Sequence, residues 1–147
     1  MRQPKLFVLY ALIFLLPLNI ACSQGKEEAI SDNPMQKSSS DGQVLVTNDI
    51  DIDFSQHKVT FIELGADSCV PCKAMQPSMK EIAEEYAGKI QVVFYDVWKD
   101  PQPARHYRIQ LIPTQVFIDP DGNEIFRHVG LFSKEKILEM LKEKKIL

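Results

Sequence analysis

The chain has 147 residues, of which 45% are hydrophobic and 25% charged, and its formal net charge is −3 at pH 7. This length and composition accommodate one globular domain with a real core plus an N-terminal appendage. The acidic charge balance argues against a general nucleic-acid-binding protein, and three cysteines are too few for a disulfide scaffold.

The N-terminal residues 1–22 have the pattern of an export signal. Arg2 and Lys5 precede a nearly continuous apolar stretch from Leu6 to Leu18. This stretch matches the h-region of a secretory signal and is too short for a comfortable membrane span. We therefore expect the folded domain to lie outside the cytoplasm, in a periplasm or on the outer cell surface.

Ala21-Cys22, at the end of this segment, resembles the lipobox of bacterial lipoproteins, although Asn19 stands where that box usually has leucine. In such proteins the cysteine is lipidated and becomes the mature N-terminus. We expect Cys22 to be lipidated and to anchor the protein to the membrane. An ordinarily cleaved signal and an uncleaved anchor are the alternatives, and both also imply export.

Residues 23–42 are rich in Ser, Gln, Glu, Asp, Asn, Lys and Pro and contain few residues that could build a core. This composition predicts a flexible linker between the membrane and the domain. The folded domain is then expected to comprise residues 43–147.

The domain sequence predicts strands and helices in alternation. Continuous apolar runs indicate strands covered on both faces, and the spacing of Met75, Met79 and Ile82 indicates a helix that Pro77 should kink. In chain order the predicted elements are strands at Val44–Val46 and Val59–Leu64, a helix at Pro71–Ala87, a strand at Ile90–Val97, a short helix at Pro101–Tyr107, a hairpin of Gln115–Ile118 and Glu124–Val129, and a last helix capped by Ser133. This order implies an α/β fold with a central mixed sheet and helices on both faces.

Cys69-Val70-Pro71-Cys72 lies at the junction between a predicted strand and a predicted helix. Two cysteines with this spacing can close and reopen a disulfide with little backbone movement, and a helix N-terminus favours the thiolate that attacks disulfides. A static disulfide or half of a zinc site is the alternative. Zinc usually needs four ligands, and the three histidines lack ligand spacing, so we expect redox exchange with no metal or other cofactor.

The order of elements and this motif resemble the thioredoxin family over about residues 44–147. The residues that carry the resemblance are Cys69-Val70-Pro71-Cys72-Lys73, Pro77, Ile112-Pro113-Thr114 and Gly130. The resemblance implies that Cys69 is the nucleophile and Cys72 the resolving thiol. It also implies a cis peptide bond before Pro113.

The resemblance further implies which residues contact the substrate. These are Val70, Pro71, Ile112, Pro113 and Gly130, which would surround the cysteine pair and leave backbone groups accessible to the substrate strand.

Four positions depart from the family pattern. Ser68 replaces the tryptophan that usually precedes the first cysteine, Gly65 replaces another aromatic residue, Val70 replaces glycine, and Phe94 occupies the place of a frequent lysine. The first two changes remove aromatic surface, so substrate contacts should differ from those of a general thioredoxin. Trp98, in the turn after a predicted strand, could line the site, but we expect it to be a half-buried loop residue instead.

Glu63 is a carboxylate within an otherwise apolar strand. Burial without a partner should raise its pKa and make it a candidate proton relay for Cys72. The family commonly has aspartate at this position, one methylene shorter. The alternative interpretation is a carboxylate at a strand end that reaches solvent.

The expected function is an extracytoplasmic, membrane-anchored thiol–disulfide oxidoreductase that reduces protein disulfides through a Cys69/Cys72 dithiol–disulfide cycle. Its expected partners are protein disulfides or dithiols and a membrane electron conduit, because an exported domain cannot reach cytoplasmic NADPH. We expect a monomer that binds no nucleic acid. The alternatives are a disulfide donor or isomerase of the same fold, and a non-catalytic adaptor or metal-binding module.

Overall fold

The computed structural model describes residues 41–147, so the predicted export segment, Cys22 and most of the predicted linker lie outside the described residues. All predicted strands and helices are present in the described range, with ends that differ by one or two residues. They are β1 (Val44–Val46), β2 (Val59–Gly65), α1 (Val70–Glu85), β3 (Ile90–Asp96), α2 (Gln102–His106), β4 (Thr114–Ile118), β5 (Glu124–Val129) and α3 (Lys134–Glu143). Across residues 41–147, no helix has the length and apolar character needed to span a membrane.

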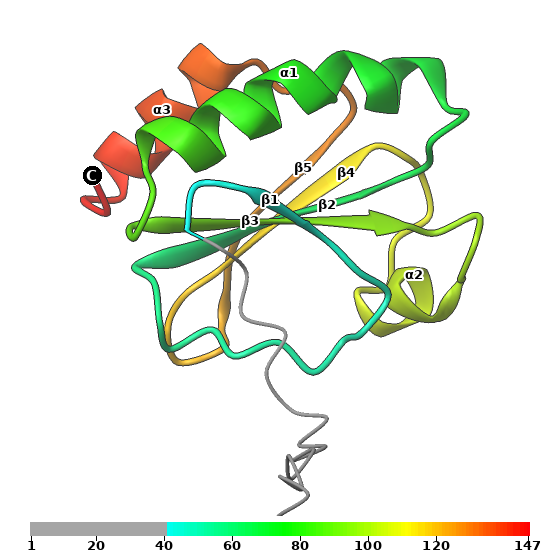
Figure 1. Cartoon of the computed structure of the whole chain (residues 1–147), viewed down its shortest axis with the longest axis horizontal. Helices are drawn as coiled ribbons and strands as arrows, with labels where there is room; N and C mark the ends of the chain where they lie inside the picture. The colour runs from blue at the N-terminus through cyan, green and yellow to red at the C-terminus, as the bar shows by residue number, and fades with distance from the viewer. Residues whose placement is uncertain (1–40) are drawn as a thin grey trace, which may run out of the picture. The chain divides into compact units, whose positions relative to one another are not determined.

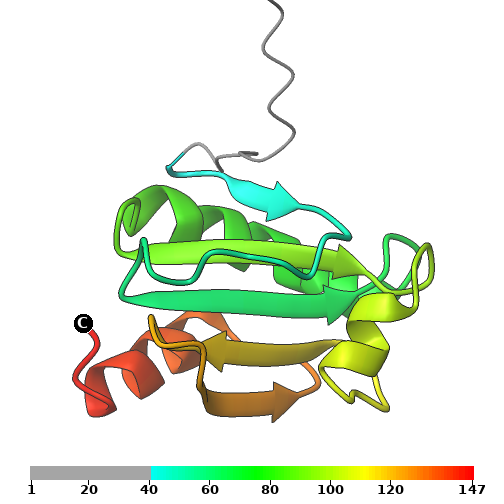
Figure 2. The ribbon, with the colours of Figure 1, turned by 90° about the horizontal axis from the view of Figure 1, so that it is seen from below.

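The five strands of this range form one mixed sheet in the order β1-β3-β2-β4-β5 (Figures 1 and 2). Strand β3 pairs in parallel with both β1 and β2, whereas β4 pairs antiparallel with β2 and β5. The long pairing of β2 with β3 runs from Val59 opposite Ile90 to Gly65 opposite Asp96. The predicted mixed central sheet is therefore confirmed. Because β2 and β3 are parallel, their carboxyl ends lie at the same end of the sheet.

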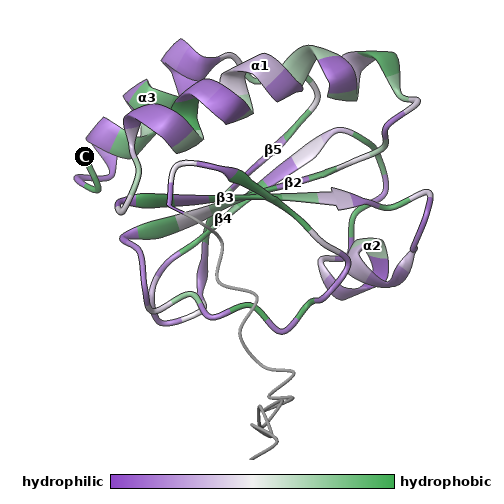
Figure 3. Cartoon of the chain, viewed as in Figure 1, coloured by the Kyte–Doolittle hydropathy of each residue, from purple (hydrophilic) through white to green (hydrophobic). Residues whose placement is uncertain are grey.

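Helices cover both faces of the sheet, as predicted. Helices α1 and α3 pack on one face, and α2 lies on the other (Figure 1). Hydrophobic residues gather on the central strands, whereas the outer surface of α1 is largely hydrophilic (Figure 3). Apolar residues thus lie in the interior and polar residues face solvent, because burying apolar surface away from water stabilises the fold by about 25 cal/mol per Å².

Aromatic and sulfur-containing side chains fill the core beneath α1 and α3. Phe61 and Phe117 stack with ring centroids 4.9 Å apart, and Met75 and Met79 from α1 are buried beside them. The prediction that these methionines fill the core is confirmed. On the outside, the Lys134 ammonium of α3 forms ion pairs with two carboxylates of α1, which helps to hold the two helices together.

Candidate active site

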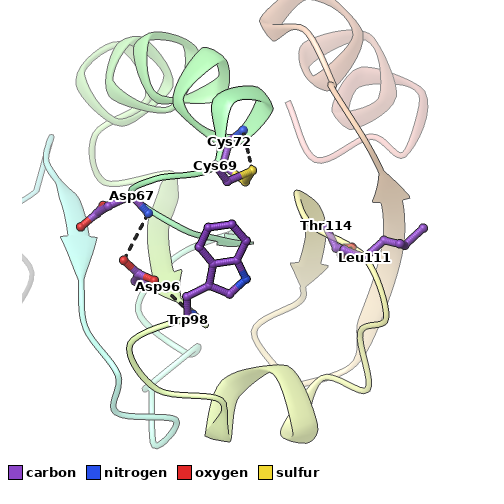
Figure 4. Close-up of a disulfide and its surroundings, with 7 residues drawn as sticks. All are labelled: Asp67, Cys69, Cys72, Asp96, Trp98, Leu111 and Thr114. Atoms are coloured by element: carbon purple, nitrogen blue, oxygen red, sulfur yellow. Dashed lines mark hydrogen bonds between the residues drawn. A yellow bond between two sulfur atoms is a disulfide. The ribbon is translucent and has the colours of Figure 1, made fainter.

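Cys69 and Cys72 form a disulfide at the N-terminus of α1. Cys69 is the N-cap residue, and its Sγ accepts a hydrogen bond from the Cys72 N–H at 3.3 Å (Figure 4). Helix α1 begins at Val70, one residue earlier than predicted, and continues through Pro77 to Glu85. Cys69 retains 7% of its surface exposed and Cys72 none, so only the first cysteine is accessible from solvent.

Gly65 allows the first turn of α1 to lie directly on the end of β2. A Cβ atom at this position would lie 3.1 Å from the Cβ of Cys72 and 3.1 Å from Cε2 of Phe94. A side chain here, such as the aromatic residue that the thioredoxin family often carries, would require Cys72 and Phe94 to move by a few tenths of an ångström. The glycine therefore relieves a tight contact where Cys72 lies against the strand.

The loop before β4 packs against the disulfide. The Ile112–Pro113 peptide bond is cis, as the resemblance implies, and Ile112 packs against the buried cluster that contains both cysteines. The Thr114 hydroxyl donates a hydrogen bond to the Leu111 carbonyl at 2.6 Å, which holds the loop in place. The structure thus brings together the two motifs that are about forty residues apart in the sequence.

Gly130 joins this loop from the end of β5. Its N–H donates a hydrogen bond to the Pro113 carbonyl at 2.9 Å, and its φ of 99° lies in the left-handed region that favours glycine. Apart from Gly130 and its two chain neighbours, no atom of residues 41–147 lies within 4 Å of where its Cβ would stand, so these residues leave the backbone open to an approaching chain.

Glu63 lies fully buried in the middle of the sheet. Neither carboxyl oxygen has a hydrogen-bond partner within residues 41–147, and burial raises the pKa of this group from 4.5 to about 8. The predicted burial and raised pKa are confirmed, and the alternative of a solvent-reaching carboxylate is wrong. The reason is tertiary: α1 packs over this face and excludes water.

Asp96 is an organising residue that the sequence analysis did not identify. Its carboxylate accepts hydrogen bonds from the N–H groups of Asp67, Trp98 and Lys99, and it also pairs with the Lys99 ammonium. Burial alone would raise the pKa of Asp96, but these donors together lower it. Asp96 therefore ties the loop before Cys69 to the turn that carries Trp98, and its sequence signal was an acid closing a buried strand.

Trp98 is 63% exposed, so the prediction of a half-buried loop residue is wrong. Its indole points toward the disulfide (Figure 4). Trp98 lines a hollow of about 400 Å³ together with Leu111 and Ile112, the residue that packs against the cysteines. Val70 and Leu111 are also largely exposed, so apolar side chains surround the site despite the loss of the usual family aromatics.

The arrangement is suited to thiol–disulfide exchange. It combines an accessible sulfur at a helix N-terminus, a buried second sulfur and a buried carboxyl that can hold a proton near neutral pH. Within residues 41–147, no three or more His, Cys, Asp or Glu side chains are grouped so that they could hold a metal ion.

Residues 43–143 match the model of the thioredoxin family. A thioredoxin from Staphylococcus aureus is 31% identical over 99 residues, which are 67% of this chain and 94% of that protein. Among solved structures, a mutant thioredoxin from Halobacterium salinarum superposes with a TM-score of 0.62 and 23% identity, over 72% of this chain and 94% of its own. The short form of thioredoxin f from spinach chloroplast gives a TM-score of 0.62 and 22% identity, over 74% and 98%.

The buried carboxyl makes the stability of the fold dependent on pH. Between pH 4.5 and about 8 the unfolded chain has lost the Glu63 proton while the folded chain retains it, so the free energy of unfolding should fall as the pH rises. Glu63→Leu should abolish this fall and stabilise the protein above pH 8 by up to roughly 5 kcal/mol. Urea unfolding of the disulfide form at several pH values measures the effect.

The matched control for this experiment is Glu84→Leu, because Glu84 is an exposed carboxylate on α1. It should leave the pH dependence of unfolding unchanged. If Glu63→Leu keeps the same decline between pH 4.5 and 8 as the unaltered protein, Glu63 is not the group responsible.

Proposed function

The chain belongs to the thioredoxin family, and we propose that this thiol–disulfide oxidoreductase reduces disulfides of proteins outside the cytoplasm. One observation carries the proposal: an accessible Cys69 at a helix N-terminus is disulfide-bonded to a fully buried Cys72. This asymmetry supports different roles for the two sulfurs. Cys69 reacts with the substrate, whereas Cys72 reacts only with Cys69.

In the reductive direction, the Cys69 thiolate attacks one sulfur of a substrate disulfide. A mixed disulfide forms, and the other substrate sulfur leaves as a thiolate. Cys72 then attacks Cys69, which forms the Cys69–Cys72 disulfide and releases the second substrate thiol. Two electrons pass to the substrate, and the protein must receive two electrons before the next cycle.

The N-terminus of α1 stabilises the Cys69 thiolate through its dipole and through the Cys72 N–H that points at this sulfur. Cys72 is fully buried, unlike Cys69, so its thiol needs a base to take up its proton. Glu63 supplies one, since a carboxyl with a pKa of about 8 can both accept and release a proton near neutral pH.

The substrate binds over Cys69 between the cis-proline loop and Trp98. The Ile112 N–H and C=O make no hydrogen bond within residues 41–147, so both can pair with an extended substrate strand. Gly130 leaves room for that strand, and Val70 and Pro71 border it on the helix side. Trp98 provides an apolar surface for a side chain next to the substrate cysteine.

The export-like segment of residues 1–22 supports a location outside the cytoplasm, with Cys22 as the lipidated anchor. A membrane protein that carries reducing equivalents outward would then regenerate the dithiol. Pro71 between the cysteines supports the reductive direction, because within the family it is typical of reducing members.

Trapping of the mixed disulfide tests the catalytic roles. Cys72→Ala removes the resolving thiol, so covalent complexes through Cys69 should accumulate and be released by a reductant. Cys69→Ala is the matched control and should trap nothing, while disulfide reductase turnover is abolished in both variants. Non-reducing electrophoresis and mass spectrometry identify the complexes. If Cys69→Ala traps as many partners as Cys72→Ala, the assignment of the nucleophile is wrong.

The redox potential of the Cys69–Cys72 couple gives the direction of electron flow. A value near about −270 mV agrees with a reductant, and one near about −120 mV agrees with a disulfide donor. Equilibration with glutathione or dithiothreitol buffers of known potential measures it, and the second value would contradict the reductive direction.

Trp98 should contribute to substrate binding rather than to the chemical steps. Trp98→Ala is expected to raise KM for a disulfide-bonded protein substrate roughly three- to tenfold with little change in kcat. Trp98→Phe keeps an apolar ring and should restore most of the loss, and a small aromatic disulfide should be reduced at an unchanged rate. An unchanged KM in Trp98→Ala would show that substrates do not contact the indole.

Lipidation should depend on Cys22. In a bacterial host, the full chain should incorporate a labelled fatty acid and fractionate with membranes, whereas Cys22→Ala should lose the label and stay as an unprocessed precursor. Cys69→Ala serves as the control with an unchanged label. Release of an unlabelled mature protein from the unaltered chain would indicate an ordinarily cleaved signal instead.

A further inference from the structure

A row of four residues crosses the sheet on the face that α1 and α3 cover. Glu63 in β2 lies opposite Phe94 in β3 on one side and opposite Gln115 in β4 on the other. His128 in β5 lies opposite Gln115. Cross-strand partners share a face of the sheet, and Phe94 belongs to the core beneath α1 and α3, so the whole row faces those helices. The row thus places three polar side chains in succession.

Glu63 and Gln115 are both fully buried. Neither the two carboxyl oxygens of Glu63 nor the amide nitrogen and oxygen of Gln115 have a hydrogen-bond partner within residues 41–147. Buried polar atoms in proteins are nearly always hydrogen-bonded, because leaving them unpaired costs free energy. Two such groups on directly opposite residues are therefore notable.

The surroundings of Glu63 offer few other partners. Phe94 is apolar, and the buried residues that α3 contributes to this core are Ile137, Met140 and Leu141. Helix α1 presents Cys72, whose Cβ lies 3.1 Å from where a Cβ at Gly65 would stand, two residues beyond Glu63 on the same face. Since Gly65 has no side chain, no residue of β2 separates Glu63 from the Cys72 sulfur.

We propose that Gln115 is a positioning residue for the proton relay, hydrogen-bonding the Glu63 carboxyl through its side-chain amide and orienting it toward the Cys72 sulfur. Directly opposite residues have Cβ atoms about 4.5–5.5 Å apart. Side chains as long as Glu and Gln bridge that separation by a change of rotamer alone. The backbone register therefore already supports the contact.

A carboxamide suits this role because it can pair with both forms of the acid. Its oxygen accepts a hydrogen bond from the protonated carboxyl, and its N–H group donates one to the carboxylate. The bond to the charged form is the stronger of the two, so Gln115 favours the carboxylate and opposes the effect of burial. When Cys72 gives its proton to the Glu63 carboxylate, the amide exchanges one bond for the other without leaving either group unpaired.

His128 is the titratable group at the far end of the row. It is half-buried, its ring stacks on Phe132, and its Nε2 lies 3.2 Å from the Leu131 carbonyl oxygen. A protonated His128 would stabilise the charged, carboxylate form of Glu63 by electrostatic attraction. Gln115 lies between the two groups, so a pH experiment has to separate its effect from that of the imidazole.

The test is the titration of Glu63 itself in the reduced protein, followed by the carboxyl carbon resonance in NMR. Gln115→Met removes the amide at nearly constant volume and should raise the Glu63 pKa by about one unit. At pH values below that pKa the carboxylate fraction then falls about tenfold, and so should the rate at which Cys72 resolves a mixed disulfide on Cys69. The rate should recover as the pH is raised.

Three comparisons make the result specific to Gln115. Phe117→Leu alters packing two residues further along the same face of β4 and should leave the Glu63 pKa unchanged. His128→Phe removes the imidazole, and Gln115→Met should still raise the Glu63 pKa in that background. In a Glu63→Gln background, Gln115→Met should have no further effect on the resolution rate, because the group it positions is gone.

An unchanged Glu63 pKa in Gln115→Met would overturn the proposal, as would a further loss of resolution rate in the Glu63→Gln background. The inference rests on the proposed function only for the rate measurement. The NMR titration needs no substrate, so a protein that traps no partner through Cys69 could still show the shifted pKa. The two proposals can therefore fail separately.

Discussion

The packing of the first turn of α1 against the end of β2 is the constraint on which the rest of the site depends. Gly65 eases it, because a Cβ at this position would lie only 3.1 Å from the Cβ of Cys72, closer than most such contacts in proteins. The contact buries Cys72 completely and leaves Cys69, at the helix N-cap, with an accessible edge. It also closes the sheet face above Glu63 to water. The different environments of the two sulfurs and of the nearby carboxyl thus follow from one close approach.

Two acids near this contact show how strongly local surroundings set their ionisation. Glu63 is buried without a hydrogen-bond partner in the described part of the chain, and its pKa rises to about 8. Asp96, at the end of the neighbouring strand, is also buried, but three N–H groups and an ammonium point at it and lower its pKa. Glu63 can therefore exchange a proton near neutral pH, whereas Asp96 stays charged and holds the loops together.

The apolar surface around the disulfide is built differently from the family pattern. The usual aromatics at positions 65 and 68 are replaced by Gly65 and Ser68, yet Trp98 points at the disulfide from the turn after β3. Asp96 fixes that turn through its bonds to the N–H groups of Trp98 and Lys99. An aromatic side chain thus faces the disulfide from the turn after β3 rather than from the strand–helix loop.

The sequence by itself determined the strands, the helices and the identity of the cysteine pair, because hydrophobic periodicity, turn residues and the CxxC spacing are local signals. It also indicated that Glu63 would be buried, since a lone acid stands inside an apolar strand. Only the tertiary structure showed that Trp98 is exposed beside the disulfide and that Asp96 joins two loops. It alone placed Gln115 opposite Glu63, because β2 and β4 are distant in the sequence and their register depends on how the hydrophobic patterns of both strands pack together.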